Sequence, residues 1–486
     1  MRTIATFDIG TTAVKGAFVL EDGRTVAQGS VELETLHAGD FHEQRPDDWW
    51  RAFCRLSRDM QKEYGEPVCA ICMSGQMQDV IPVGEDLRPL RNAILYSDGR
   101  AGEEARAIQE AVGAQAILAR TGNPFDGSIS LPKMLWLKRH EPEVYARTRC
   151  FLISSKDYVA AKCTGAFASD RTSCSTAGCM NLQSGQWDET IVGAAGLRID
   201  KLPRLCASHE RVGAVTASAA LETGYAEGTP VYAGAGDAGA TSLASGLSRP
   251  GQYNINLGTS GWVATLSESA LRREGVFNLG AMPEGKIINI VPFLNGAGAH
   301  RWVSTLFSHD DSPDYARMDA LLAQSVPGAN GVMALPYLTG ERFPVLDEKA
   351  RGAFIGLSPD TRACDLSRAM LEGVAFSIRQ GLEQLGTEPQ EISLIGGGAR
   401  VAIWREILCN VLGKPVTVFS NADTLPARAI AAAALIGEGA LAGYDAFVEG
   451  LKREGAQTVQ PDASLRALYD AQYLRYRKIY PALQGV

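Results

Sequence analysis

The chain has 486 residues, of which 45% are hydrophobic and 21% charged, a composition typical of a globular protein and unlike that of a disordered one. This length predicts two domains, and a net charge of −8 without a basic stripe argues against nucleic acid or an acidic membrane surface as a partner. The sequence starts with a strand-like stretch rather than a charged and then apolar leader, and its apolar runs are too short for a membrane helix, so we expect a cytoplasmic protein.

The first predicted elements are three strands and a helix. Apolar and β-branched residues at 3–10, 16–21 and 25–33 predict consecutive antiparallel strands, with a hairpin turn at residues 21–23. Residues 47–64 repeat their apolar side chains with the period of a helix, and aspartates stand near its start. Strands that alternate with helical patterns in this way indicate the α/β class.

Cys69 and Cys72 form a C-x-x-C pair among ten scattered cysteines. No second pair follows at the distance of a zinc ribbon, and the pair lies within a strand-like apolar run. We therefore interpret both cysteines as structural residues of a protein that folds in a reducing cytosol.

A glycine pattern at residues 234–239, G-A-G-D-A-G, fits the dinucleotide fingerprint G-x-G-x-x-G and follows a short apolar strand. A dinucleotide site also needs an acid about 20 residues further on to bind the ribose hydroxyls. No Asp or Glu follows Asp237 before Glu268, and Asp237 itself would place a carboxylate against a pyrophosphate, which is electrostatically unfavourable. We interpret the glycines instead as thinning the backbone so that Asp237 can stand in a cleft.

A short motif occurs twice, about half the chain apart. The first copy at residues 8–12 (DIGTT) and the second at residues 256–260 (NLGTS) each follow an apolar strand and precede another. A glycine turn with hydroxyl side chains offers backbone N–H groups and side-chain donors to a phosphate. Two copies at this spacing predict duplicated domains, residues 1–245 and 246–486, that grip one polyphosphate between them.

A third glycine cluster, residues 396–398, joins a buried strand to a helix in the second half of the chain. Backbone without side chains, next to a helix N-terminus, is suited to binding a nucleotide base with its ribose and phosphate. Further strands are expected at residues 251–258, 261–268 and 391–395, with helices from residue 299 onward, at 400–413, and at 464–483, where a stripe of leucines and tyrosines is expected to cover the core.

Ordered blocks run along nearly the whole chain, from FDIGTTAVKG through HEQRPDDWW, SGQMQDVIP, GAGDAGA, NLGTSG and LPYLTGERFP to LIGGGAR. In this order and spacing they resemble the FGGY carbohydrate kinases of the actin-like ATPase superfamily, and within that family the xylulokinases. Residues 130–136, with Lys133 between them, and residues 352–372 fit the two signature patterns of the family. The resemblance implies an α/β fold of two duplicated actin-like (ribonuclease H-like) domains with the catalytic cleft between them.

The resemblance also implies an enzyme that uses ATP and Mg²⁺ to phosphorylate a small sugar, with D-xylulose converted to D-xylulose 5-phosphate. Asp237 matches the general base and Asp8 the N-terminal aspartate that places metal and phosphate, so both are candidate metal contacts. Met77 and Gln78 fall where xylulokinases contact the sugar, beside Asp237. The expected ATP-binding residues are Gly10, Thr11, Thr12 and Lys15 in the first turn, Gly258, Thr259 and Ser260 in the second, and Gly397, Gly398, Ala399, Trp404 and Asn410 at the adenosine motif.

Several positions depart from the xylulokinase pattern. Gln78, Tyr96 and Ala238 stand where those enzymes usually have histidine, tryptophan and asparagine, and all three lie on the sugar side. Ala429 replaces a glycine after the adenosine motif. A family member acting on another ketose, a polyol or a sugar acid is therefore an alternative, as is a non-enzymatic actin-like ATPase. Sugar and ATP are the expected partners, and the sequence leaves a homodimer open.

Overall fold

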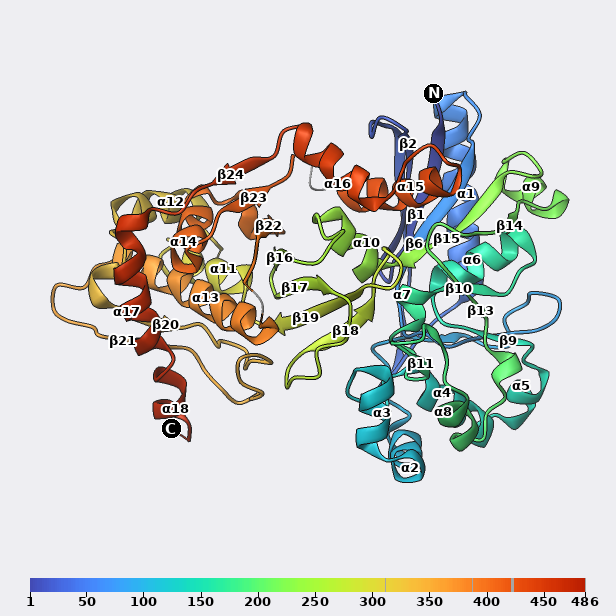
Figure 1. The fold of residues 1–486 in the computed structure, drawn as a ribbon, viewed down its shortest axis with the longest axis horizontal. Helices are drawn as coiled ribbons and strands as arrows, with labels where there is room; N and C mark the ends of the chain where they lie inside the picture. Colours follow the sequence, from blue (N-terminus) through green and yellow to red (C-terminus); the bar gives the residue numbers. More distant parts are fainter. Residues whose placement is uncertain (311, 387, 421–423, 486) are drawn as a thin grey trace.

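The structure is a computed structural model that describes residues 1–310, 312–386, 388–420 and 424–485 (Figure 1). Two α/β lobes lie side by side, the first half of the chain on the right of Figure 1 and most of the second half on the left. Among the helices of the described residues, none is long and apolar enough to cross a membrane.

The first lobe is built on a six-stranded sheet with the strand order β14-β15-β6-β1-β2-β3. Strands β1, β2 and β3 pair antiparallel, which confirms the predicted order of the first three strands. Strand β6 pairs parallel with β1, and β15 pairs parallel with β6. The strands are β1 (Thr3–Ile9), β2 (Ala13–Leu20), β3 (Thr25–Glu32), β6 (Ala70–Gly75), β14 (Arg211–Ala214) and β15 (Pro230–Gly236).

Helices cover both faces of this sheet. Along β1, Ala5 and Phe7 pack into the apolar cluster under α1 (Pro46–Tyr64) and α6 (Ser155–Thr164). Ile4 points the other way, into the cluster under α10 (Asp237–Ala244) and α15 (Leu425–Gly437). This alternation is that of a strand buried on both faces. The predicted helix at residues 47–64 is confirmed as α1.

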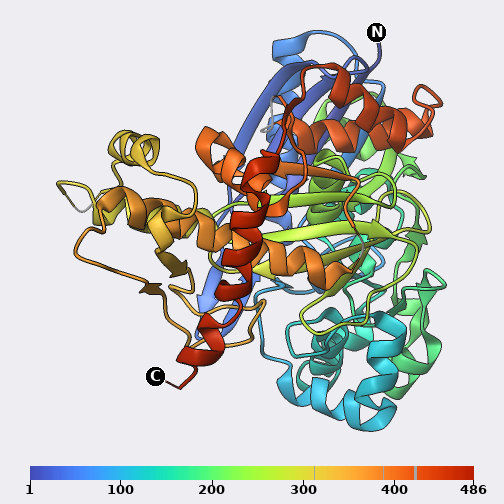
Figure 2. The ribbon, with the colours of Figure 1, turned by 60° about the vertical axis from the view of Figure 1, so that its left-hand side comes forward.

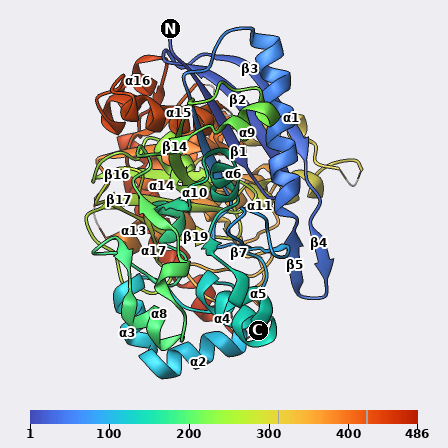
Figure 3. The same cartoon turned by 90° about the vertical axis from the view of Figure 1, so that its right-hand side faces the viewer.

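Smaller elements extend the first lobe. Figure 3 shows the hairpin of β4 (Leu36–Ala38) and β5 (Phe41–Gln44) standing out from the lobe, and β5 also pairs with β8 (Ala93–Ile94). Strand β7 (Ile81–Val83) pairs with β9 (Cys150–Leu152). The helices at the lower end are α2 (Gly102–Val112), α3 (Ala114–Thr121), α4 (Ser130–His140) and α5 (Pro142–Arg147).

The second lobe repeats the first. Its seven-stranded sheet has the order β18-β19-β17-β16-β22-β23-β24, and the run β19-β17-β16-β22-β23 has the same strand directions as β3-β2-β1-β6-β15. This is the duplicated ribonuclease H-like arrangement expected from the sequence. The strands are β16 (Gln252–Leu257), β17 (Gly261–Ser267), β18 (Phe277–Gly280), β19 (Ile287–Phe293), β22 (Glu391–Ile395), β23 (Val416–Val418) and β24 (Gln457–Val459).

The C-terminal helices pack over the second lobe (Figure 2). Tyr469, Tyr473 and Tyr476 are buried in its main core, so the predicted role of this stripe in covering the core is confirmed. The helix expected at residues 464–483 is interrupted between residues 476 and 479. The main helices of the lobe are α11 (Ala297–Leu306), α12 (Tyr315–Gln324), α13 (Ala363–Leu385), α14 (Ala402–Leu412), α17 (Arg466–Tyr476) and α18 (Ile479–Leu483).

One helix of the second half returns to the first sheet. Helix α15 packs against β1, β6 and β15, and Ala429 within it is fully buried there. The hydroxyl of Tyr232 in β15 donates to Oε1 of Glu438, just beyond α15, at 2.6 Å. The predicted boundary between residues 245 and 246 falls between α10 and β16 and stays a prediction, because the two halves share this layer of helices.

The C-x-x-C pair lies at the start of β6. Cys72 is buried in the strand and Cys69 precedes it at the surface, and both are free thiols. Within the described residues, no group of three or more His, Cys, Asp or Glu side chains is arranged to hold a metal ion.

Candidate active site

The carboxyl ends of three parallel strands meet at one edge of the first sheet. Asp8 at the end of β1 is aligned with Ser74 of β6, and Gly236 at the end of β15 is aligned with Gly75. Asp237 follows Gly236 directly and opens α10. The edge therefore collects Asp8, Asp237 and the segment after β6, at the position where ligands of such sheets bind.

Asp8 is a half-buried carboxylate in a hydrogen-bonded environment. Ser74 Oγ donates to Asp8 Oδ1 at 2.8 Å. Burial raises the pKa of Asp8, while the Ser74 hydrogen bond and the positive charge of Lys15 oppose that rise. In the turn that follows, Thr11 Oγ1 donates to Gln76 Oε1 at 3.1 Å, which ties the predicted phosphate turn to the β6 segment.

Asp237 is exposed to solvent, yet the protein around its carboxylate shifts the pKa of that group. Loss of hydration is the main cause, and the negative charge of Asp8 adds to it, so that the pKa of Asp237 is raised to about 7. The Ala238 amide donates to Asp237 Oδ1 at 2.7 Å and opposes the rise. A carboxylate with this pKa can accept and release a proton near neutral pH.

The glycines around Asp237 have packing reasons of their own. A Cβ atom on Gly234 would lie 1.8 Å from the Met73 carbonyl oxygen, and Gly234 has a φ of 67°. A Cβ atom on Gly236 would lie 2.4 Å from Met77 Sδ. Side chains at these positions would push β15 away from β6 and move Asp237 from the strand edge.

The second predicted phosphate turn lies between β16 and β17, with Thr259 and Ser260 exposed. Backbone hydrogen bonds fix it to the start of α11, since the Ala297 amide donates to the Gly258 carbonyl at 2.7 Å and the Gly298 amide to the Thr259 carbonyl at 3.0 Å. The turn therefore has a defined position from which its hydroxyls face solvent.

The third glycine cluster lines a cavity of about 580 Å³. Gly396 adopts a φ of 92°, and a Cβ atom there would lie 2.6 Å from the Leu257 carbonyl carbon. Gly398 turns inward instead, because a Cβ atom on it would lie 2.5 Å from Leu257 Cγ. The cavity is lined by Thr241, Asn256, Gly396, Gly397, Ala399, Arg400 and Arg405, among others.

Two residues expected at the adenosine motif do not line this cavity. Trp404 is fully buried, packs against His300 and donates from Nε1 to the Leu371 carbonyl at 3.3 Å. Asn410 stands near the far end of α14, where its Oδ1 accepts from the Asp462 amide at 2.7 Å. Neither lines the cavity: Trp404 lies beneath the glycine turn, where a Cβ atom on Gly398 would be 3.0 Å from its ring, and Asn410 stands on another face of α14.

A second cavity, of about 510 Å³, lies beside Asp8. Asp8 and Lys15 line it, and Pro426 lines both cavities, so the two adjoin. Thr241 of the first cavity stands four residues after Asp237 on α10, so their side chains share one helix face, about 6 Å apart along the axis. The two cavities therefore form a path from the glycine cluster to Asp8, and Asp237 lies one helical turn from Thr241 but lines neither cavity.

The predicted sugar-side residues lie just after β6. Met77 is buried against Gly236, whereas Gln78 is half-buried and its Nε2 donates to the Thr176 carbonyl at 3.4 Å. Sequence reasoning missed the roles of Asp79 and Lys133, which are both fully buried beside Gln78. The signal available was an acidic residue directly after the Met-Gln pair, within an apolar run.

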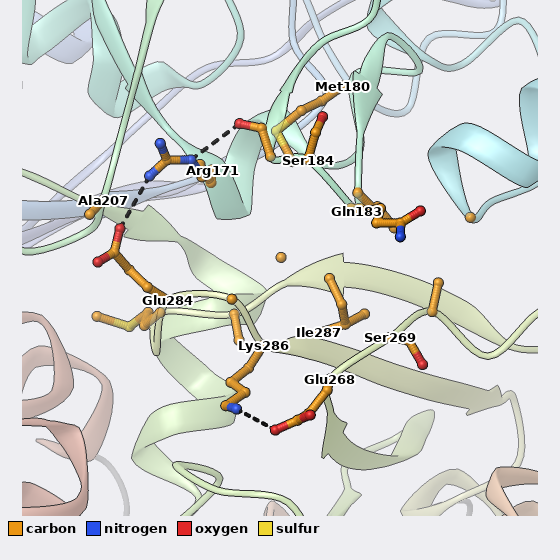
Figure 4. Close-up of a pocket in the computed structure, with 18 of the residues that line it drawn as sticks. Arg171, Met180, Gln183, Ser184, Ala207, Glu268, Ser269, Glu284, Lys286 and Ile287 are labelled. Atoms are coloured by element: carbon orange, nitrogen blue, oxygen red, sulfur yellow. Dashed lines mark hydrogen bonds and ion pairs between the residues drawn. The ribbon is translucent and has the colours of Figure 1, made fainter.

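A separate cavity of about 460 Å³ lies between the lobes, away from the strand edge (Figure 4). Arg171 in α7 (Arg171–Cys174) pairs with Glu284 of the second lobe at 3.3 Å, and Lys286 pairs with Glu268 at 2.8 Å. Since these opposite charges neutralise one another, we interpret this region as a contact between the lobes.

Family models match both halves of the chain. The model for the N-terminal domain of the FGGY family of carbohydrate kinases matches residues 3–244, and that for the C-terminal domain matches residues 253–438. The chain belongs to the FGGY family of carbohydrate kinases. It is a sugar kinase that uses ATP, and this excludes the alternative of a non-enzymatic actin-like ATPase.

Known proteins resemble the kinase over its whole length. A xylulose kinase from Escherichia coli (strain K12) is 31% identical over 484 residues, which cover 98% of both chains. A gluconokinase from Bacillus subtilis (strain 168) is 28% identical over 427 residues, covering 85% of this chain and 83% of that protein. The crystal structure of a xylulose kinase from Rhodospirillum rubrum matches with a TM-score of 0.89 at 30% identity and covers 99% of both chains.

Proposed function

We propose that the kinase transfers the γ-phosphoryl group of ATP to D-xylulose and forms D-xylulose 5-phosphate. The observation that carries the proposal is Asp237, a solvent-accessible carboxylate with a pKa near 7 that follows β15 at the strand edge where Asp8 ends β1. The choice of xylulose is supported by the similarity to xylulose kinases along nearly the whole chain.

On the nucleotide side, we assign adenosine to the cavity lined by Gly396, Gly397 and Ala399 and the phosphates to the two glycine turns. The turns at residues 10–12 and 258–260 would offer amide and hydroxyl donors from opposite lobes. Lys15 lines the adjoining cavity and would add a positive charge near the phosphates. These roles are supported by the path between the cavities and by the duplicated position of the turns.

Asp8 and Asp237 fit a divalent cation. They present carboxylate oxygens at one strand edge, and the charge of Asp8 raises the pKa of Asp237, a repulsion that a cation would relieve. Mg²⁺ in kinases is held by one or two carboxylates together with substrate phosphates, so these two residues suffice. When bound, the ion would neutralise charge on the transferred phosphoryl group.

Asp237 would act as the general base. The Ala238 amide engages Oδ1, and the proton of the attacking sugar hydroxyl would pass to Oδ2. The positive charge of a bound ion and the binding of the hydroxyl would keep the carboxylate ionised until the transfer. Met77 and Gln78 would border the sugar, because they follow the strand that lies between Asp8 and Asp237.

The second candidate function is a kinase for an acceptor other than D-xylulose, and the residues expected near the sugar favour it. Gln78, Tyr96 and Ala238 differ from the expected histidine, tryptophan and asparagine, and one relative is a gluconokinase. Another ketose, a polyol or a sugar acid therefore competes with D-xylulose.

A substrate panel tests the proposal. Purified kinase with MgATP is offered D-xylulose, other ketopentoses, ketohexoses, pentitols and gluconate, and ADP release is recorded with the phosphorylated product identified by mass spectrometry. We expect the highest kcat/KM for D-xylulose. If another acceptor has a higher kcat/KM, that compound replaces D-xylulose as the proposed substrate. If none of these compounds causes ADP release, the sugar-kinase assignment of the site is refuted.

A further inference from the structure

Asp79 and Lys133 are a buried acid and a buried base beside the segment of Met77 and Gln78, and neither takes part in the proposed phosphoryl transfer. The side chains of Asp79 and Lys133 are both 0% exposed. Charged residues are almost never buried so completely unless they serve each other or a ligand. Asp79 follows Gln78 directly, and Lys133 comes from α4.

Their contacts join two segments of backbone. Lys133 Nζ donates to the Leu95 carbonyl at 2.6 Å and to the Gln78 carbonyl at 3.2 Å. Asp79 Oδ1 accepts from the Tyr96 amide at 3.2 Å. The two charged groups therefore hold the peptide that follows Gln78 and the peptide that precedes Tyr96. Gln78 and Tyr96 are two of the three positions where this chain departs from the xylulokinase pattern on the sugar side.

The backbone of Gln78 is held in an unfavourable conformation. Its φ is 63°, in the left-handed region that a glutamine seldom adopts. Such strain persists only where surrounding contacts enforce it, and it gathers at functional sites. The bond from Lys133 to the Gln78 carbonyl is a contact of this kind.

The charges of the two groups are linked to each other and to the general base. Burial raises the pKa of Asp79, the Lys133 charge opposes the rise, and the charge of Asp237 adds to it. Burial lowers the pKa of Lys133 to about 8, against the charge of Asp79. Asp79 Oδ2 is buried and has no hydrogen-bond partner in the described structure. An apolar pair would fill this space without such costs, so packing alone does not explain the two residues.

We propose that Asp79 and Lys133 are positioning residues for the acceptor, which hold the strained Gln78 peptide and the Tyr96 amide so that both side chains meet the sugar. The inference rests on the proposed function, because it takes the acceptor to lie between these segments and Asp237. It adds a pair that would tune which sugar the site accepts without touching the sugar.

Two variants test the pair. Asp79→Asn keeps an acceptor for the Tyr96 amide and removes the charge, and Lys133→Met removes both the charge and the donors. For each we expect KM for the best acceptor to rise about ten- to a hundredfold, as for a lost hydrogen bond to a charged group. KM for ATP should stay within twofold. Because the two residues hold one structure, the double variant should be no worse than the poorer single variant.

Asp188→Asn is a matched control in the same lobe. Asp188 is also buried and charge-paired, with Arg120 Nη1 at 2.9 Å, and it caps α8 (Glu189–Ala194) without a hydrogen bond to Gln78, Leu95 or Tyr96. Its variant should lose thermal stability and keep the acceptor KM, which separates positioning from general loss of packing.

The outcomes are distinct from those of the substrate panel. An inactive parent enzyme refutes the proposed function, whereas an active parent whose folded Asp79 and Lys133 variants keep the acceptor KM overturns the positioning role. A rise in KM for ATP instead would also overturn it. If one variant does not fold, the acceptor KM of the other variant decides. If neither variant folds, the two residues are required for folding, and the positioning role is overturned.

Discussion

Replacing Asp237 by Asn tests the centre of the proposed mechanism. The amide keeps the shape of the side chain and an acceptor for the Ala238 amide, but it cannot take a proton at neutral pH. General base catalysis contributes about 10²–10⁴-fold, so kcat should fall by that factor, which corresponds to about 3–5 kcal/mol in the activation free energy. KM values for sugar and ATP should change much less than kcat, because Asn can still hydrogen-bond the sugar hydroxyl and Asp8 still offers a carboxylate to the cation.

The pH dependence provides an independent measure on the parent enzyme. With a pKa of about 7, Asp237 is ionised in about one molecule in eleven at pH 6 and in most molecules at pH 8, so kcat/KM for the sugar should rise about tenfold over this range. Removing the charge of Asp8 with Asp8→Asn should move this rise to lower pH, because Asp8 contributes to the raised pKa of Asp237. The assay is coupled ADP release at limiting MgATP and limiting sugar, where the rate reports the free enzyme in which no cation neutralises the two carboxylates.

The thermal stability of the Asp237→Asn variant shows whether Asp237 is a catalytic base or a structural residue. The folded pKa of Asp237 lies above the unfolded value of about 4, so its contribution to the free energy of unfolding is full below pH 4 and is lost as the pH rises through 7. The Asn variant should therefore melt at a higher temperature than the parent at pH 8. A folded Asp237→Asn enzyme that works within a few-fold of the parent rate refutes the catalytic role, and a lower melting temperature refutes the electrostatic reasoning.

Three further predictions concern the sugar side, the glycine turn and the lobes. Gln78→Ala should weaken apparent sugar affinity by about 1–3 kcal/mol and leave KM for ATP unchanged, and an effect on ATP alone would contradict its placement. Gly396→Ala should lower the free energy of unfolding by roughly 1–3 kcal/mol and raise KM for ATP, because its φ of 92° and the 2.6 Å approach to Leu257 leave no room for a side chain. Gly450→Ala in α16 (Tyr444–Arg453), where a Cβ atom meets open space, is its control and should not destabilise in chemical denaturation. Addition of a non-hydrolysable ATP analogue and sugar together should reduce the radius of gyration in small-angle scattering, since the two turns lie on different lobes, and an unchanged radius at saturation would count against domain closure.

Local sequence signals predicted the parts of the site that depend on backbone. Alternating apolar residues indicated β1 to β3, and the repeated D-I-G-T-T and N-L-G-T-S turns indicated the duplication. In both turns a backbone carbonyl comes close to the glycine, since a Cβ atom would lie 3.0 Å from the Ala13 oxygen at Gly10 and 2.8 Å from the Ser260 oxygen at Gly258. Asp237 could be singled out because its charge is incompatible with the dinucleotide pattern around it.

Other features could not be predicted because they depend on tertiary packing. The helical period shows that α14 has a buried face, but it does not show which side chains of that helix line a cavity, so the sequence does not reveal that Trp404 is fully buried in the core. Likewise, nothing local indicates that Asp79 and Lys133, far apart in the chain, are buried on the same pair of peptides.

The return of α15 to the first sheet bears on how the gene of such a kinase can be divided. A fragment ending at residue 245 would lack the helix that covers Ile4, Val19 and Tyr232, and it would present that apolar face to water. The complementary fragment would carry α15, an alanine-rich helix buried on nearly all sides in the whole protein, without the sheet that covers it. Expressed separately, the two pieces should aggregate or remain unfolded, whereas expressed together they should reassemble through α15 into an active, nicked enzyme. The two lobes thus match in topology but are not independent, because the first lobe contains a helix that the second half of the chain supplies.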